Sequence, residues 1–519
     1  MKLLRLLTIV LLATLGLQAQ AQAPKVVTDT RYARGATMAF GRIEKLSRNG
    51  GPSVKAKGFC LSEKAQPTVD DTLSTKTMTQ GGSTIYYFEN LKPGTMYYMR
   101  AYATNEDGET SYGDVIKFST VPKGNITYWY NNGGDATANK RINDALTQAC
   151  DIFNNLTCIS KHFSVGYSAG TPTADCNYKD DPWMNMGAND SYQRTGTIMH
   201  EMEHGLGVIP YSTHWSGDIL RSGNGTGEWL GDRVSAFLDF WDGKTGSRLK
   251  GDTQHMWPYG INGAHEDNGT ELLYTAQSLI MQALGEDGLP PTGGFCTPAY
   301  VFDQEDTTRY YLRSESPNHG LSTSFLVENR LRNLRSVDMT PAEAAANDSC
   351  AWHITFNPAT GYYQFRNVAT GHYLTYTTTS GSGSFKLVQK DKPASTENIH
   401  LMRGRVDAKM EIDDATTLAV RGYWIIHPES SATPPCMTAG TGGAVSTASF
   451  SLANSATTQR WVILSEGDMA GIIRTAIDVP TAQSLAPAES TYFDLLGRPV
   501  EGRPAKGIYI SGGKKVLIR

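Results

Sequence analysis

The sequence predicts a multidomain, largely β protein with a single α+β domain near its middle. A chain of 519 residues is longer than one hydrophobic core normally supports. Residues 24–121 and 297–467 contain short alternating segments between Gly, Asn and Asp turns, which is typical of strands. Residues 122–295 also contain long runs with helical spacing of apolar residues. We therefore expect a β-sandwich at 24–121, an α+β domain at 122–295, a β-trefoil at 297–467 and a small β unit at 475–519.

Residues 1–21 have the pattern of a secretory signal peptide. Lys2 and Arg5 precede an apolar run, Leu6 to Leu17, and Ala19-Gln20-Ala21 supplies the small residues of a cleavage site. The apolar run is too short to span a bilayer. A formal net charge of −4 argues against nucleic acid as a partner. We expect an exported protein.

The seven cysteines include no Cys-x-x-Cys pair, so a thiolate metal site is not expected. Export permits disulfides. Cys150, Cys158 and Cys176 lie close enough in sequence for one bridge.

The clearest strand of the β-sandwich lies in Leu91–Asn105. It places Tyr97, Met99 and Ala101 on one face and their neighbours on the other. The pattern Leu-x-Pro-x-Thr-x-Tyr-x-x-x-Ala-x-Ala-x-Asn in this stretch resembles fibronectin type III domains. The resemblance implies a module that contacts substrate or a partner, or one that acts as a spacer.

The α+β domain is predicted to begin with a strand at 125–130 and a helix at 136–156. Candidate strands follow at 164–167 and 183–186. We consider residues 183–187 as an edge strand that an extended peptide could join, or as an interior strand. Trp183 and Asn185 are accordingly candidate substrate-binding residues.

The principal motif is His-Glu-x-x-His, formed by His200, Glu201 and His204. Residues four apart share a helix face, so the two imidazoles can reach one tetrahedral Zn²⁺. Glu201 can then reach a water on the metal as a general base. Candidate N-cap residues stand at 189–191, and Gly205 and Gly207 are expected to end the helix. The alternative is a buried histidine pair on an ordinary helix.

Two histidines leave a catalytic zinc one protein ligand short. His214, ten residues beyond His204, is the preferred third ligand. His255, Asp218 and Glu228 are the other candidates. Glu228-x-x-x-Asp232 resembles the second motif of thermolysin-like peptidases, although residues 229–241 also read as a capped amphipathic helix.

The segment His200–Gly207, with Gln254–Gly260 downstream, resembles secreted bacterial metzincin-like zinc peptidases. The resemblance implies a zincin-like fold, Zn²⁺, and peptide-bond hydrolysis with Glu201 as the general base on zinc-bound water. It also implies a methionine turn, for which Met256 is the candidate, with Tyr259 near the substrate. Pro210 stands where the metzincin pattern has its third histidine.

Residues 297–467 contain a threefold internal echo. Phe325, Phe385 and Phe450 begin similar segments about sixty residues apart, which suggests the three units of a β-trefoil. Gln459-x-Trp461 resembles the ricin-B lectin repeat, and that resemblance implies carbohydrate binding. A trefoil that binds protein, or binds nothing, is the alternative.

The C-terminal residues 491–500 and 506–518 follow a linker around 478–490 and predict a small β unit with a Gly-Gly hairpin turn. They resemble the C-terminal sorting domain of type IX secretion in Bacteroidetes. The resemblance implies handling by that secretion machinery and a secreted or cell-surface protein.

Two functions follow from these features. The first is a secreted zinc endopeptidase acting on extracellular proteins or glycoproteins. The second is a cell-surface, glycan-binding adhesin with an inactive or secondary peptidase domain.

Overall fold

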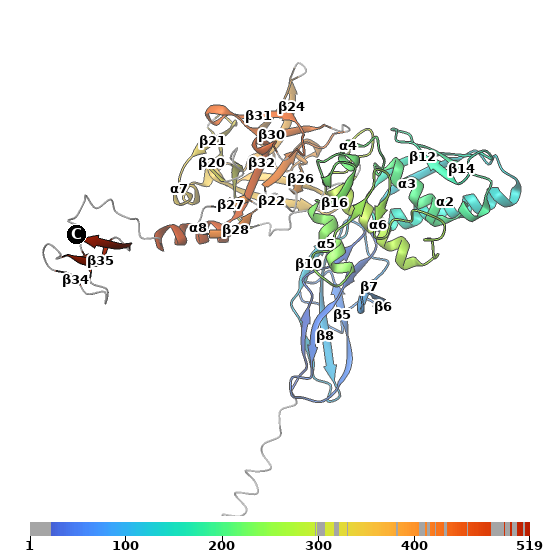
Figure 1. Cartoon of the computed structure of the whole chain (residues 1–519), viewed down its shortest axis with the longest axis horizontal. Coiled ribbons are helices and arrows are strands. Elements are labelled where there is room, and N and C mark those ends of the chain that lie inside the picture. Colours follow the sequence, from blue (N-terminus) through green and yellow to red (C-terminus); the bar gives the residue numbers. More distant parts are fainter. Residues whose placement is uncertain are drawn as a thin grey trace, which may run out of the picture. The chain divides into compact units, whose positions relative to one another are not determined.

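The protein is a multidomain, mostly β chain with several sheets and few helices (Figure 1). This computed structural model describes residues 22–295, 297, 307–315, 321–329, 331–379, 382–403, 410–412, 416–420, 422–429, 433–453, 455–478, 492–493, 499–500, 506–511 and 514–518. The chain divides into two compact units, Met1–Met469 and Ala470–Arg519. The predicted signal peptide and most of the predicted linker lie outside the described residues.

The N-terminal part of the first unit consists of antiparallel sheets around one apolar core, as a β-sandwich requires. In β8 burial alternates along the strand, with Tyr97, Met99 and Ala101 inside, which confirms the predicted faces. The strands are β1 (Lys25–Thr28), β2 (Ala33–Arg34), β3 (Ala39–Gly41), β4 (Ile43–Ser47), β5 (Val54–Ser62), β6 (Lys76–Gln80), β7 (Ser83–Phe88), β8 (Met96–Asn105), β9 (Thr110–Tyr112) and β10 (Ile116–Ser119).

A four-stranded sheet in the order β11-β12-β14-β13 follows, and it supports the candidate site. Strands β11, β12 and β14 are parallel, and β13 pairs antiparallel with β14. The predicted strand at 183–186 is therefore interior, and β13 occupies the edge. The elements are β11 (Asn125–Tyr130), α2 (Ala136–Leu156), β12 (Ser160–Tyr167), β13 (Ala174–Cys176) and β14 (Trp183–Met186).

Helix α3 (Thr195–Gly205) carries the His-Glu-x-x-His motif. The cap residues predicted at 189–191 do not cap the N-terminus of α3. Asn189 instead caps a short 3-10 turn, η1 (Asp190–Tyr192). A distant residue serves the helix, because Asp267 accepts a hydrogen bond from the Gly196 backbone N–H at 3.1 Å. The exit follows the prediction, since Gly207 has φ +113°, a conformation that favours glycine.

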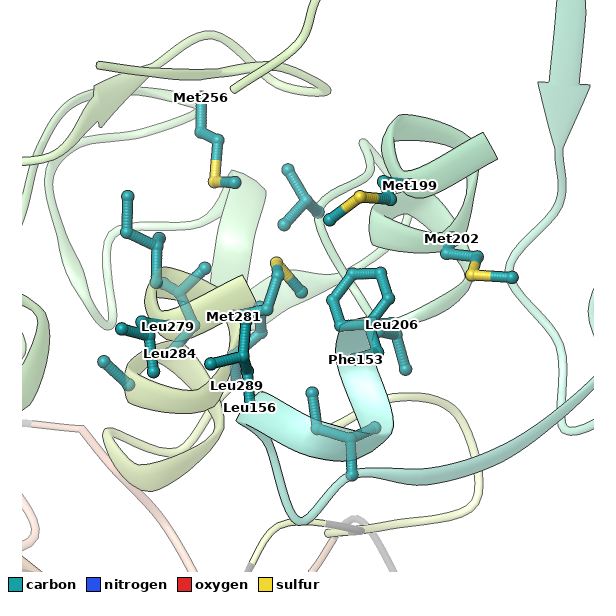
Figure 2. Close-up of a cluster of buried hydrophobic side chains, with 14 of the residues drawn as sticks. Phe153, Leu156, Met199, Met202, Leu206, Met256, Leu279, Met281, Leu284 and Leu289 are labelled. Carbon is teal, nitrogen blue, oxygen red and sulfur yellow. The ribbon is translucent and has the colours of Figure 1, made fainter. Parts of the chain in front are cut away.

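Beyond α3 the chain forms short strands and two longer helices. The elements are α4 (Thr213–Ser216), β15 (Arg221–Gly223), β16 (Thr226–Trp229), α5 (Asp232–Trp241), β17 (Lys250–Gly251), β18 (Met256–Trp257) and α6 (Glu271–Glu286). Their apolar side chains share one core with α2 and α3, in which Phe153, Met199, Met202, Met256 and Met281 take part (Figure 2). Burying this common core holds α3 and β18 in place.

A bridge among Cys150, Cys158 and Cys176, which their closeness in sequence permits, does not form, because Cys150 and Cys176 are free thiols. Cys60, Cys350 and Cys436 are also free, and Cys296 lies outside the described residues. Cys158 is instead hydrogen-bonded to Gln282, its Sγ lying 3.4 Å from the amide oxygen.

Residues 310–465 form a twelve-stranded antiparallel sheet system with its own core. Its elements are β19 (Tyr310–Glu315), β20 (Leu321–Glu328), β21 (Leu334–Asp338), α7 (Pro341–Ala345), η2 (Asp348–Cys350), β22 (Ala351–Asn357), β23 (Tyr362–Asn367), β24 (Tyr373–Thr379), β25 (Ser382–Val388), η3 (Ser395–Glu397), β26 (His400–Arg403), β29 (Gly422–Ile426), β30 (Pro435–Ala439), η4 (Thr441–Gly443), β31 (Val445–Ser449), η5 (Thr457–Gln459) and β32 (Arg460–Ser465). A separate hairpin pairs β27 (Met410–Ile412) with β28 (Thr416–Val420).

The three echoed phenylalanines, Phe325, Phe385 and Phe450, are all buried. The Gln459-x-Trp461 motif is also internal. The Gln459 amide donates to the Ser449 carbonyl at 2.8 Å, and the Trp461 indole N–H donates to the Met437 carbonyl at 3.0 Å. This motif therefore stabilises the fold and presents neither side chain to a ligand.

The last elements are α8 (Glu466–Asp478), β33 (Tyr492–Phe493), β34 (Pro499–Val500), β35 (Gly507–Ser511) and β36 (Lys514–Ile518). The register pairs Ser511 with Lys514, as the predicted two-residue hairpin requires. Among the described residues, no helix combines the length and apolarity needed to cross a membrane.

The N-terminal module is joined to the α+β region by buried polar contacts. Arg42 donates to the Phe240 carbonyl at 2.9 Å and to the Trp241 carbonyl at 2.7 Å, both at the end of α5. Arg34 pairs with Glu286 at 2.8 Å, and both side chains are buried. A charged side chain buried against such partners resists separation, because its partners would lose their hydrogen bonds.

We predict that Arg42→Ala lowers the free energy of unfolding by about 2–4 kcal/mol, because it removes a hydrogen-bond donor from each of the buried carbonyls of Phe240 and Trp241. Urea unfolding followed by tryptophan fluorescence measures the change. Arg48→Ala, at an exposed position nearby, is the control and should change stability by less than about 0.5 kcal/mol. Equal stabilities of the two variants would contradict the importance of this interface.

Candidate functional site

The His-Glu-x-x-His face of α3 opens into a pocket of about 750 Å³. His200, Glu201 and His204 line it from the helix, and His255 lines it from the loop before β18. Edge strand β13 lines it through Asp175 and other residues. This volume falls within the usual range of ligand-binding clefts.

Three imidazoles gather in this pocket. The ring centroids of His200 and His204 are 4.6 Å apart, and His255 lies 5.6 Å from His200 and 6.4 Å from His204. Imidazoles on one tetrahedral zinc have centroids about 5 Å apart, given Zn–N distances of about 2.1 Å. His255, one of the alternative third ligands, is therefore the histidine that the fold brings to the other two.

Hydrogen bonds set the orientation of two of these rings. His204 Nδ1 lies 2.8 Å from the Val208 carbonyl, which can only accept, so this nitrogen carries the proton. His255 Nδ1 lies 2.9 Å from the Asp252 carboxylate. Both contacts leave Nε2 available as a metal ligand, and such outer partners are typical of metal-binding histidines.

Burial determines the charge of the helix residues. It lowers the pKa of His200 to about 3, with the neighbouring His204 and His255 adding to the effect. Burial also lowers the pKa of His204. Both imidazoles are consequently neutral near pH 7, which is the form that binds a metal.

Burial raises the pKa of the two buried carboxyl groups of α3, whereas it lowers the pKa of the imidazoles. Burial, reinforced by Asp175, raises the pKa of Glu201 to about 8. Burial raises the pKa of Glu203 well above its usual range. A cation in the pocket would oppose both shifts, because an opposite charge nearby favours the ionised carboxylate.

The side chains that line the pocket are of types that zinc prefers. As these side chains lie, no group of three His, Cys, Asp or Glu residues in the described part of the chain could hold a metal ion. However, Glu201 Oε2 is buried at the pocket without a hydrogen-bond partner, and such an atom is costly unless a ligand or a small side-chain movement satisfies it. Three imidazoles with an open fourth position are a known catalytic zinc environment.

The preferred third ligand, His214, lies in α4 and does not line the pocket. Its pKa is lowered to about 4 by burial alone. Asp218 and Glu228 do not line the pocket either, and Glu228 forms an ion pair with Lys250 at 3.4 Å.

The substrate-binding candidates also lie outside the pocket. The Trp183 indole N–H donates to Asn185 at 2.8 Å, and Trp183 lies beside Trp129 with ring centroids 6.3 Å apart. Tyr259 donates to Asp242 at 2.7 Å and accepts from Gln80 of the N-terminal module at 2.6 Å. Its ring therefore anchors the loop instead of facing the pocket.

Met256 directly follows His255 and is fully buried. Its side chain points into the apolar cluster that contains Leu279 and Met281 (Figure 2). The loop after it is tight: Asn262 donates to the Met256 carbonyl at 3.0 Å, and Tyr259 has φ +71°. Met256 thus supports the loop that carries His255.

Sequence reasoning did not select several pocket residues, among them Asp175, Cys176 and His265. Asp175 and Cys176 belong to an edge strand of three residues, which is too short to be recognised from alternation. A signal did exist for His255, because Asp252 precedes it by three residues and supports its ring.

No protein-family model matches the sequence, and no curated protein matches it. Among solved structures, the chain is similar to the Haemophilus ducreyi cytolethal distending toxin at 14% identity, covering 32% of this chain and 88% of that chain, with a TM-score of 0.20. It is also similar to a fibronectin type-III domain of human fibronectin type III domain containing protein 3 at 20% identity, covering 23% of this chain and 98% of that chain, with a TM-score of 0.15. Neither likeness, at these scores, bears on the chemistry of the pocket.

We predict that His255→Ala abolishes stoichiometric zinc binding, whereas His214→Ala retains it, because only His255 lies beside the α3 histidines. Metal analysis of the purified variants by mass spectrometry measures this. Zinc loss in His214→Ala with retention in His255→Ala would reverse the assignment of the third ligand.

Proposed function

We propose that this protein is a zinc-dependent endopeptidase whose metal is held by His200, His204 and His255. The observation that carries the proposal is the gathering of three imidazoles around the pocket that Glu201 also lines. The proposal includes a zincin-like fold for residues 122–295. The parallel sheet, the helix α2 behind it and the motif helix α3 support that assignment.

Glu201 is the general base of the proposed reaction. A bound zinc would polarise water and the scissile carbonyl. Glu201 takes the proton of the attacking water and then delivers it to the leaving amine nitrogen. Its carboxylate oxygen lies 4.0 Å from Nε2 of His204, one of the proposed metal ligands. Asp252 and the Val208 carbonyl keep the imidazoles oriented during these steps.

An extended peptide is the proposed form of the substrate. Strand β13 is the edge of its sheet and also lines the pocket, so its backbone can pair with an incoming strand. Such pairing would carry the scissile bond past Glu201. The proposed substrates are extracellular proteins or glycoproteins.

The remaining proposals concern location and accessory modules. The signal peptide pattern and the C-terminal unit support export by type IX secretion to the medium or the cell surface. A β-trefoil at 297–467 is supported by the three buried phenylalanines of the echoed segments. Carbohydrate binding by this region requires residues other than Gln459 and Trp461, because both are engaged internally.

A glycan-binding adhesin is the competing function. Glycan-array binding by a protein that purifies without zinc and cleaves no peptide would favour it. Zinc at one equivalent, together with cleavage of an unfolded protein substrate, would favour the peptidase.

We predict that Glu201→Gln retains zinc and lowers kcat by about 10²- to 10⁴-fold, because it removes the proton acceptor and leaves the imidazoles intact. Peptide cleavage and metal content are measured on the same preparation. His204→Ala should lose both zinc and activity. Undiminished cleavage by Glu201→Gln would refute the role of this residue.

A further inference from the structure

We propose that Glu203 is a positioning residue for His200, accepting a hydrogen bond from Nδ1 of that imidazole so that Nε2 faces the metal. This inference rests on the proposed function. It assigns a role to the second glutamate of the His-Glu-Met-Glu-His segment, which takes no part in the proton transfers described above.

The other two imidazoles show what His200 lacks. His204 is oriented by the Val208 carbonyl and His255 by the Asp252 carboxylate, each through Nδ1. His200 Nδ1 is buried and has no hydrogen-bond partner. A ring without such a partner is free to choose the wrong tautomer or rotation, which weakens metal binding.

Glu203 supplies the missing acceptor. Its Oε2 lies 4.0 Å from His200 Nδ1 and is itself buried without a partner. The two residues are three apart on α3 and therefore share a face of the helix. A rotation of either side chain would close this gap to a hydrogen bond of about 2.9 Å, with the imidazole N–H as donor and the carboxyl oxygen as acceptor.

The other oxygen of Glu203 is already held. Gln277 of α6 donates its amide to Glu203 Oε1, and both side chains are fully buried. The anchored oxygen fixes the carboxyl group, and the second oxygen faces His200. Helix α6 therefore supports the metal-binding face of α3 through one polar side chain within an otherwise apolar contact.

The cost of burying Glu203 supports a functional role. The neighbouring positions Met199 and Met202 are buried and apolar, and an apolar residue at 203 would pack on α6 without desolvating a carboxyl group. Replacing both members of a buried polar pair by apolar residues is often neutral or stabilising, so packing alone does not require Glu203 and Gln277 at these positions. Orientation of a metal ligand is a role that an apolar side chain cannot fill.

The test compares Glu203→Leu, Glu203→Gln and the full-length wild type. Zinc affinity is measured by competition with a chromophoric chelator, and the thermal midpoint of the metal-free protein is measured in parallel. We expect Glu203→Leu to weaken zinc binding by about 10- to 100-fold. Glu203→Gln keeps an acceptor oxygen and should recover most of that affinity. Glu271→Gln, at an exposed position on the same supporting helix α6, is the control and should match the wild type.

Two further readouts separate orientation from general stability. The metal-free thermal midpoint should not fall in proportion to the zinc affinity, and the visible spectrum of the cobalt-substituted protein should change in Glu203→Leu. Wild-type zinc affinity in Glu203→Leu would overturn the positioning role and leave the proposed function intact. A wild-type protein that binds no zinc would overturn both. If Glu203→Leu does not fold, Gln277→Leu releases the anchored carboxyl group and should weaken zinc binding several-fold, and unchanged affinity there would count against the proposal.

Discussion

The site depends on one geometric constraint, the spacing of four residues between His200 and His204 on a buried helix. One turn of helix brings the two imidazoles to 4.6 Å between ring centroids. The same burial that packs Met199 and Met202 into the core keeps both rings neutral. A helix in this position therefore presents two neutral imidazoles to the pocket, and a third imidazole comes from another part of the fold.

The third imidazole, that of His255, lies on a loop, so contacts with the rest of the fold have to fix its position. The Asp252 carboxylate lies within hydrogen-bond distance of the His255 ring, and the next residue, Met256, is packed in the apolar core. Tyr259 extends the support to the N-terminal module, because its hydroxyl bridges Asp242 and Gln80. Together with Arg42, this contact makes the N-terminal module a structural part of the α+β region. A freely moving spacer would not share hydrogen bonds with the loop that carries His255.

Local patterns were sufficient for much of the fold. The helix at 136–156, the strand at 125–130 and the alternation of β8 follow from apolar spacing and agree with the structure. The start of α3 was predicted wrongly, because the acceptor that serves its N-terminus, Asp267, lies 71 residues away from Gly196. The bridge that closeness in sequence permits among Cys150, Cys158 and Cys176 does not form, since closeness in sequence alone does not bring thiols together. The strand at 183–186 is interior because β13 pairs with its outer side. The sequence left this open, since β13 is too short to be recognised from alternation.

The sequence by itself determined the pair of histidines and the glutamate between them, because helical periodicity relates those residues without reference to the rest of the chain. It also contained the support for His255, in the carboxylate three residues earlier. Only the tertiary structure placed His255 at the pocket and His214 outside it, and only it brought Glu203 against Gln277. The physical reason is range: a helix imposes its spacing over a few residues, whereas the approach of a loop 51 residues beyond His204 depends on packing of the whole core.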